Sequence, residues 1–112
     1  MGEEIFLLLG SNLSDRKANL QQAIEHIGFS IGPVILRSSI YQTAAWGKTD
    51  QPDFYNQAIQ VSSSLSPEEI LTETQNIEKM LGRERGELWG PRTMDIDILF
   101  YGTRVLHQPR LQ

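Results

Sequence analysis

Cysteine is absent from this chain of 112 residues, which excludes a disulfide framework and a thiolate metal site. Positive charge is also scarce, because ten Lys and Arg stand against fourteen Asp and Glu, a net charge of −4. A mildly acidic chain lacks the basic surface with which proteins bind the phosphates of nucleic acids. We therefore expect no nucleic-acid partner and no need for an oxidising compartment.

Long apolar runs are missing as well. The run Ile5–Leu9 is short, and two glutamates precede it. A signal peptide needs a longer apolar region after a basic start, and a membrane helix needs about 20 apolar residues. We expect a cytoplasmic protein with no membrane partner, present as a monomer or a weak dimer.

Hydrophobic residues make up 39% of the chain, enough for the core of one domain over residues 1–112. Their spacing predicts strands over 5–9, 34–41, 55–65 and 94–101, with a short fifth strand after Gly102-Thr103. The first run does not alternate, which predicts a central strand with both faces covered.

Two helices are predicted between these strands. The first has an apolar face from Leu20 to Ile27, an N-cap at Ser11 or Ser14, and an end at Gly28. The second begins with a capping box at Ser66-Pro67-Glu68-Glu69, carries the stripe Ile70, Thr74, Ile77 and Leu81, and ends at Gly82. The order β-α-β-β-α-β favours an α+β ferredoxin-like sandwich, an antiparallel sheet with the helices on one face.

Asp95 and Asp97 are the strongest chemical signal. Two residues apart on a strand, they share one face at a spacing of about 6–7 Å, while Ile96 and Ile98 take the other face. Adjacent carboxylates repel unless a cation lies between them, and Mg²⁺ prefers such oxygen ligands. The alternative is the solvated face of an edge strand. The apolar continuation of the strand looks central and buried, which favours a metal site.

The stretch Trp89-Gly-Pro-Arg-Thr-Met-Asp-Ile-Asp-Ile-Leu99 resembles the signature of the 6-hydroxymethyl-7,8-dihydropterin pyrophosphokinases of folate biosynthesis. Further matching segments follow in the family's order: Leu9-Gly-Ser-Asn12, Ser39-Ile-Tyr-Gln-Thr43, Gln51-Pro-Asp-Phe-Tyr-Asn56, Gln75-Asn-Ile-Glu78 and Gly82-Arg83. The resemblance implies the ferredoxin-like fold and the transfer of pyrophosphate from ATP to the hydroxymethyl group of the pterin, with release of AMP.

The resemblance also implies roles for individual residues. The catalytic residues would be Arg83, Arg92, Asp95 and Asp97, with two Mg²⁺ ions on the two aspartates. Contacts with the nucleotide, ATP, would come from Gln75, Glu78, Arg85, Trp89, Arg92, Ile98 and Arg110. The pterin would contact Thr43, Ala44, Trp46, Phe54, Asn56 and Asp95; Ala44 stands where the family usually has proline, and Phe54 where it often has tyrosine.

Several of these side chains also suit purely structural roles. Arg83 fits a helix C-terminus, Arg85 a solvated loop, and Trp89 a residue that packs its loop onto the core. Glu78 lies near the apolar face of its helix and needs a partner, which is either the nucleotide site or a salt bridge with Arg83 or Lys79.

The family continues for several tens of residues beyond the last residue here, so we expect a domain without the family's C-terminal segment and with low turnover. The alternative is a catalytically impaired binding or structural domain of the same fold. An RNA-binding domain shares the element order but needs aromatics on its central strands and a basic face. The first strand offers only Phe6, which disfavours that class.

Overall fold

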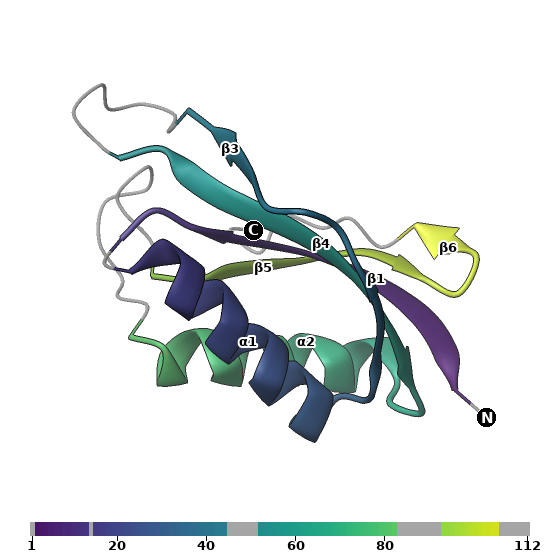
Figure 1. Ribbon diagram of the computed structural model, residues 1–112. Helices are drawn as coiled ribbons and strands as arrows, with labels where there is room; N and C mark the ends of the chain where they lie inside the picture. Colours follow the sequence, from purple (N-terminus) through teal and green to yellow (C-terminus); the bar gives the residue numbers. More distant parts are fainter. Residues whose placement is uncertain (1, 14, 45–51, 83–92, 106–112) are drawn as a thin grey trace.

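The computed structural model describes residues 2–13, 15–44, 52–82 and 93–105, which form an antiparallel sheet with two helices against one face (Figure 1). The elements are β1 (Glu3–Ser11), α1 (Arg16–Ser30), β2 (Val34–Arg37), β3 (Tyr41–Thr43), β4 (Phe54–Ser63), α2 (Pro67–Met80), β5 (Asp95–Tyr101) and β6 (Arg104–Val105). The strand order is β2-β4-β1-β5-β6, and β3 pairs with the first residues of β4. The predicted α+β ferredoxin-like sandwich is confirmed.

The hydrophobic core lies between the two helices and the sheet. Ile5, Leu7 and Leu9 of β1 are fully buried there, whereas Phe6 is 36% exposed and Leu8 is half-buried. The prediction that both faces of this strand are covered is wrong. A central strand is paired along both edges, but α1 and α2 lie on the same face of the sheet, so the other face, which we call the open face, stays accessible (Figure 1).

The start of α1 differs from its prediction, and the start of α2 agrees with it. Asp15 is the N-cap of α1, and its carboxylate accepts a hydrogen bond from the Ala18 N–H. The hydroxyl of Ser11 is instead buried at the end of β1. The capping box at Ser66 and Glu69 is confirmed. In the described part of the chain, neither α1 nor α2 is long and apolar enough to span a membrane.

Gly28 does not end the first helix, which continues to Ser30. The helix runs two residues further than predicted, and the residue that passes close to β4 after it is Gly32. A Cβ atom on Gly32 would lie 1.9 Å from the carbonyl oxygen of Ser62, so only glycine fits there. Gly82, with a φ of 88°, follows the end of α2 as predicted.

Replacing Gly28 with alanine is expected to stabilise the protein by about 0.5–1 kcal/mol, because glycine inside a helix costs that much conformational entropy. A Cβ atom at Gly28 meets nothing within 4 Å. Urea unfolding followed by circular dichroism measures the change. Gly32→Ala is the contrasting variant and should destabilise strongly; a loss of stability in Gly28→Ala would contradict the helix boundary.

Two irregularities interrupt the predicted strands. The strand over 34–41 is split at Ser38, whose hydroxyl accepts from the Ala58 N–H at 2.9 Å in place of a backbone carbonyl. In β5 a bulge shifts the register, since Ile98 pairs with Leu7 but Phe100 pairs with Phe6. The bulge reverses which residues face the helices, so Phe100 lies on the open face, 42% exposed.

Candidate functional site

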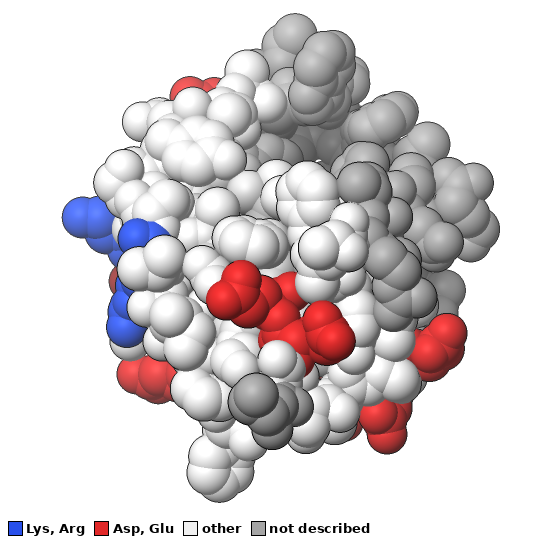
Figure 2. All heavy atoms as spheres, turned by 90° about the vertical axis from the view of Figure 1, so that its right-hand side faces the viewer, with Lys and Arg blue, Asp and Glu red and all other residues white. Residues whose placement is uncertain are grey.

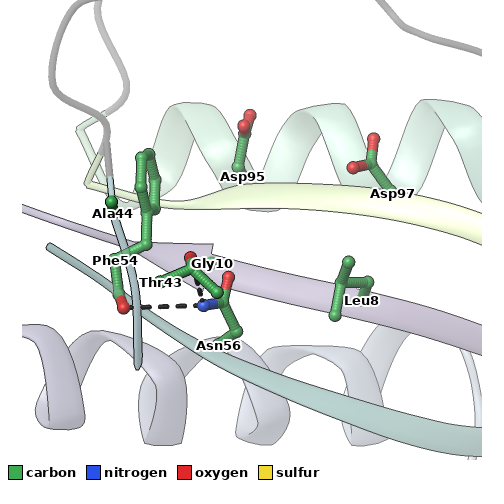
Figure 3. Close-up of a pocket in the computed structure, with 8 residues that line it drawn as sticks. All are labelled: Leu8, Gly10, Thr43, Ala44, Phe54, Asn56, Asp95 and Asp97. Atoms are coloured by element: carbon green, nitrogen blue, oxygen red, sulfur yellow. Dashed lines mark hydrogen bonds between the residues drawn. The ribbon is translucent and has the colours of Figure 1, made fainter. Parts of the chain in front are cut away.

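A pocket of about 200 Å³ lies on the open face, at the end of the sheet where β1 ends and β4 and β5 begin (Figure 3). Four strands supply its walls. Its lining residues in the described part of the chain are Leu8, Gly10, Thr43, Ala44, Phe54, Asn56, Asp95 and Asp97. The pocket therefore brings together both acidic residues and four of the predicted pterin residues, which are separated by up to 54 positions in sequence (97 − 43).

Strand register explains why these residues meet. Gly10 is paired with Asn56 of β4 on one side and with Asp95 of β5 on the other. In the next row of the same face, Leu8 is paired with Asp97. Neighbouring strands lie about 4.8 Å apart, so Asn56 and Asp95 stand about 10 Å apart across the glycine. The pairing thus places the amide of Asn56 and the carboxylate of Asp95 on opposite sides of Gly10, which has no side chain.

Asp95 and Asp97 extend from β5 on the same side, and both are half-buried (Figure 3). Ile96 and Ile98 face the core, as the alternation predicted. β5 is paired with β1 along its length, and β6 pairs with it only at Phe100 and Tyr101. The acidic pair therefore lies on the part of β5 that, among the described residues, has a strand on one side only, and both aspartates line the pocket.

The described residues contain no group of three or more His, Cys, Asp or Glu side chains placed to hold a metal ion. The pair offers two carboxylates on one face, beside the pocket. Mg²⁺ commonly takes one or two protein carboxylates, keeps several waters, and completes its shell with substrate phosphates. The donor set fits a cation that arrives with a phosphate ligand, and not one held by protein alone.

Asn56 has a defined orientation in the pocket. Its Nδ2 donates to the hydroxyl of Thr43 at 2.9 Å, with longer contacts to the carbonyl oxygens of Tyr41 and Phe54 (Figure 3). Its Oδ1 lies 3.2 Å from the point where a Cβ of residue 10 would stand. The donor end of the amide is thus used by the protein, and the acceptor end is directed towards the pocket over Gly10.

Gly10 and Leu8 line the pocket although sequence reasoning did not select them. The ring of Phe54 lies 3.4 Å from the position of a Cβ at Gly10, so any side chain there would enter the space between Phe54 and Asn56. A glycine inside a strand often marks a close approach of a ligand or another backbone, and this signal was present in the sequence.

Two polar side chains, one buried and one partly exposed, hold the start of β4. Asn12 is fully buried and donates to the carbonyl oxygen of Pro52 at 3.2 Å. Arg16 donates to the carbonyl oxygen of Asp53 at 2.8 Å, and its guanidinium lies 3.9 Å from the centroid of the Tyr55 ring. These contacts join the segment after β1 to the residues that flank Phe54, and so position one wall of the pocket.

The described residues that were predicted to contact the nucleotide do not line this pocket. Gln75 is exposed on α2, and the Ile98 side chain is in the core at 8% exposure, so only its backbone is available to a ligand on the open face. Glu78 is 1% exposed, and its Oε2 accepts from the backbone N–H of Ile96 at 2.7 Å. One partner of its carboxylate is thus a backbone amide of β5, which is not among the partners predicted for it.

Six further site predictions lie outside the described residues, as does the Arg83 partner considered for Glu78. They are Trp46, Arg83, Arg85, Trp89, Arg92 and Arg110.

Figure 2 views the molecule from the end at which the N-terminus and β6 lie. At the centre of this face some of the described acidic side chains form a cluster, others lie around its margins, and described Lys and Arg side chains lie towards one margin. The described part of this surface therefore presents carboxylates where a phosphate-binding surface would present cations.

Comparisons with known proteins point to one family. The family model described as 7,8-dihydro-6-hydroxymethylpterin-pyrophosphokinase matches residues 6–112. A pyrophosphokinase of Methylorubrum extorquens, named for 2-amino-4-hydroxy-6-hydroxymethyldihydropteridine, is 42% identical over 95% of this chain and 68% of its own. The enzyme of the same name from Bacillus subtilis is 40% identical over 99% of this chain and 67% of its own.

Larger proteins match over smaller shares of their length. The mitochondrial folate synthesis bifunctional protein of Pisum sativum is 42% identical, over 89% of this chain and 19% of that protein. The crystal structure of Plasmodium falciparum HPPK-DHPS with pteroate superposes with a TM-score of 0.67 at 17% identity, covering 91% of this chain and 29% of that one, which supports the fold. The present chain thus spans about two thirds of the length of the two bacterial relatives, and a smaller share of the two larger proteins.

The matched family model covers nearly all of the chain. The pocket in this structure unites the acidic pair with residues of three other strands. This chain belongs to the 7,8-dihydro-6-hydroxymethylpterin pyrophosphokinase family.

Proposed function

We propose that this protein transfers pyrophosphate from ATP to the hydroxymethyl group of 6-hydroxymethyl-7,8-dihydropterin, with AMP as the second product. The observation that carries the proposal is the shared pocket, in which an aromatic ring and an oriented amide lie across Gly10 from two carboxylates. The printed names of the bacterial relatives support the same chemistry.

The pterin would lie over Gly10. A flat bicyclic ring suits the face of Phe54, and its N–H donors suit the Oδ1 acceptor of Asn56. The carbonyl oxygens of Tyr41 and Phe54 keep the amide in this orientation, because they can only accept, and a flipped Asn56 would turn its Oδ1 towards them. A ring held between Phe54 and Asn56 points across the strands, so its substituent can reach the acidic pair on β5.

The acidic pair would bind the triphosphate through divalent cations. Two Mg²⁺ ions bound there supply positive charge for the triphosphate and for the transferring group. The protein's own part would be to hold the carboxylates of Asp95 and Asp97 on one face, beside the pocket proposed for the pterin (Figure 3). Most of the catalysis is then positioning and electrostatic stabilisation, with no general base required from the described residues.

The direct test is AMP formation from ATP and Mg²⁺, with and without the pterin. Pterin-dependent AMP release is the expected result, and it should disappear when the hydroxymethyl group of the pterin is replaced by methyl. Binding of pterin and ATP without any AMP would instead support a binding domain of this fold. AMP release that is independent of the pterin would overturn the proposal.

A further inference from the structure

Glu78 is the one fully buried carboxylate among the described residues, and the proposed reaction does not use it directly. It lies on α2 beside the core residue Ile77, on the face of the sheet opposite to the pocket. Burying a charged group costs several kcal/mol unless hydrogen bonds compensate for it. A leucine would fill this space at lower cost, so a specific role is expected for the carboxylate.

The hydrogen bond to Ile96 indicates that role. The Oε2 of Glu78 accepts from the backbone N–H of Ile96 at 2.7 Å, and the bond is buried. Ile96 is the residue between the two aspartates. A short bond from an amide to a carboxylate is among the stronger hydrogen bonds in proteins. Glu78 thus holds the peptide group that joins Asp95 to Ile96, from the helix side of the sheet.

The surrounding strands leave this part of β5 dependent on such a bond. β1 pairs with β5 from Asp95 to Tyr101, but β6 pairs only with Phe100 and Tyr101. In the described part of the chain, the second neighbour of β5 at Ile96 is therefore the side chain of Glu78. A strand end held on one side only is free to twist, which would change the distance between carboxylates two residues apart.

We infer that Glu78 is a positioning residue, whose buried carboxylate holds the β5 backbone at Ile96 and thereby sets the spacing of the Asp95 and Asp97 carboxylates for divalent cations. The inference rests on the proposed function of the acidic pair. It assigns to Glu78 a role through the backbone of β5 instead of a contact with the nucleotide. Residues that hold a metal-binding residue in place without touching the metal commonly change metal affinity by about 10–100-fold when they are replaced.

Two substitutions separate positioning from direct contact. Glu78→Gln keeps the length of the side chain and an oxygen that accepts from Ile96, but removes the charge. Glu78→Asp keeps the charge, but its side chain is one methylene shorter and cannot span the same distance. Positioning predicts that glutamine is the milder change, whereas a direct charge contact with nucleotide or cation predicts that aspartate is the milder one.

The experiment measures Mn²⁺ affinity by electron paramagnetic resonance in the presence of a non-hydrolysable ATP analogue, together with the ¹H–¹⁵N signal of the Ile96 amide. We expect Mn²⁺ affinity within about threefold of the unsubstituted protein for Glu78→Gln, and at least about tenfold weaker for Glu78→Asp. The Ile96 amide should stay downfield in the first variant and move upfield in the second. Ile77→Val, a small change at the adjacent buried position, should leave both readouts unchanged.

The reverse order of affinities would overturn the inference, and so would an aspartate variant that binds Mn²⁺ as tightly as the unsubstituted protein. If Glu78→Asp does not fold, Glu78→Gln decides alone: retained affinity with a retained Ile96 signal supports positioning, and lost affinity with a retained signal overturns it. Failure of the unsubstituted protein to bind Mn²⁺ with the analogue counts against the proposed function instead, because the Ile96 signal needs no cation.

Discussion

Asp97→Asn is expected to lower the rate of pterin-dependent AMP formation by about 100- to 1,000-fold, the usual effect of removing one group that stabilises transition-state charge. The same loss is expected for Asp95→Asn. Asparagine has the shape of aspartate, so the half-buried site on β5 should keep its packing. What is lost is the negative charge that a divalent cation needs from a two-carboxylate site. The measurement is the initial rate of AMP release at saturating ATP and pterin.

A matched control is Glu25→Gln, which makes the same change of charge on the exposed surface of α1. Its rate of AMP formation should stay within about twofold of that of the unsubstituted protein, because exposed charges far from a site are screened by solvent. Pterin affinity should fall much less than the rate in both aspartate variants. An Asp97→Asn protein with an unchanged rate would show that the pair is only a solvated strand face.

Gly10→Val is expected to weaken pterin binding by about 10- to 100-fold, the equivalent of the 1–3 kcal/mol that overpacking a filled site costs. A Cβ at this position would stand 3.2 Å from the Oδ1 of Asn56 and 3.4 Å from the ring of Phe54, in the space assigned to the pterin. Residue 10 lies within β1, where a β-branched side chain is favoured, so the fold should survive. Calorimetric titration with the pterin measures the loss.

Gly10→Ala should give a smaller loss in the same direction, and binding of the ATP analogue should change by less than about threefold in either variant. Gly28→Ala serves as the control, because it adds the same methyl group to an open position on α1. If Gly10→Val binds the pterin with unchanged affinity, the pterin ring does not lie over residue 10. That result would contradict the proposed position of the pterin in the pocket.

Local signals in the sequence were sufficient for most of the fold. The capping box at Ser66 and Glu69 satisfies the first amides of α2 by contacts within four residues, and Ile70, Thr74 and Ile77 are buried as their spacing predicts. The N-cap at Asp15 and the late end of α1 were missed. The N-cap at Asp15 is a local contact with the Ala18 N–H, whereas the late end of α1 depends on tertiary packing, because Gly32 passes close to Ser62 of β4.

The sheet showed the limit of local reasoning more clearly. Whether Phe6 and Leu8 are covered depends on which face receives the helices, and a run of five apolar residues carries no information about that choice. The bulge after Ile98 arises from pairing with β1, and it exposes Phe100 against the edge of the Phe6 ring, with ring centroids 6.0 Å apart. Period-two alternation cannot reveal an extra residue in one strand.

The sequence by itself determined the chemistry proposed for the site. Spacing of two along a strand places Asp95 and Asp97 on one face, and the matching segments around them identify the family. Only the tertiary structure decided how that chemistry is held. Gly10 joins Asn56 to Asp95 through strand register, and Glu78 meets Ile96 across 18 positions of sequence, because hydrogen bonds between elements depend on packing that no local pattern contains.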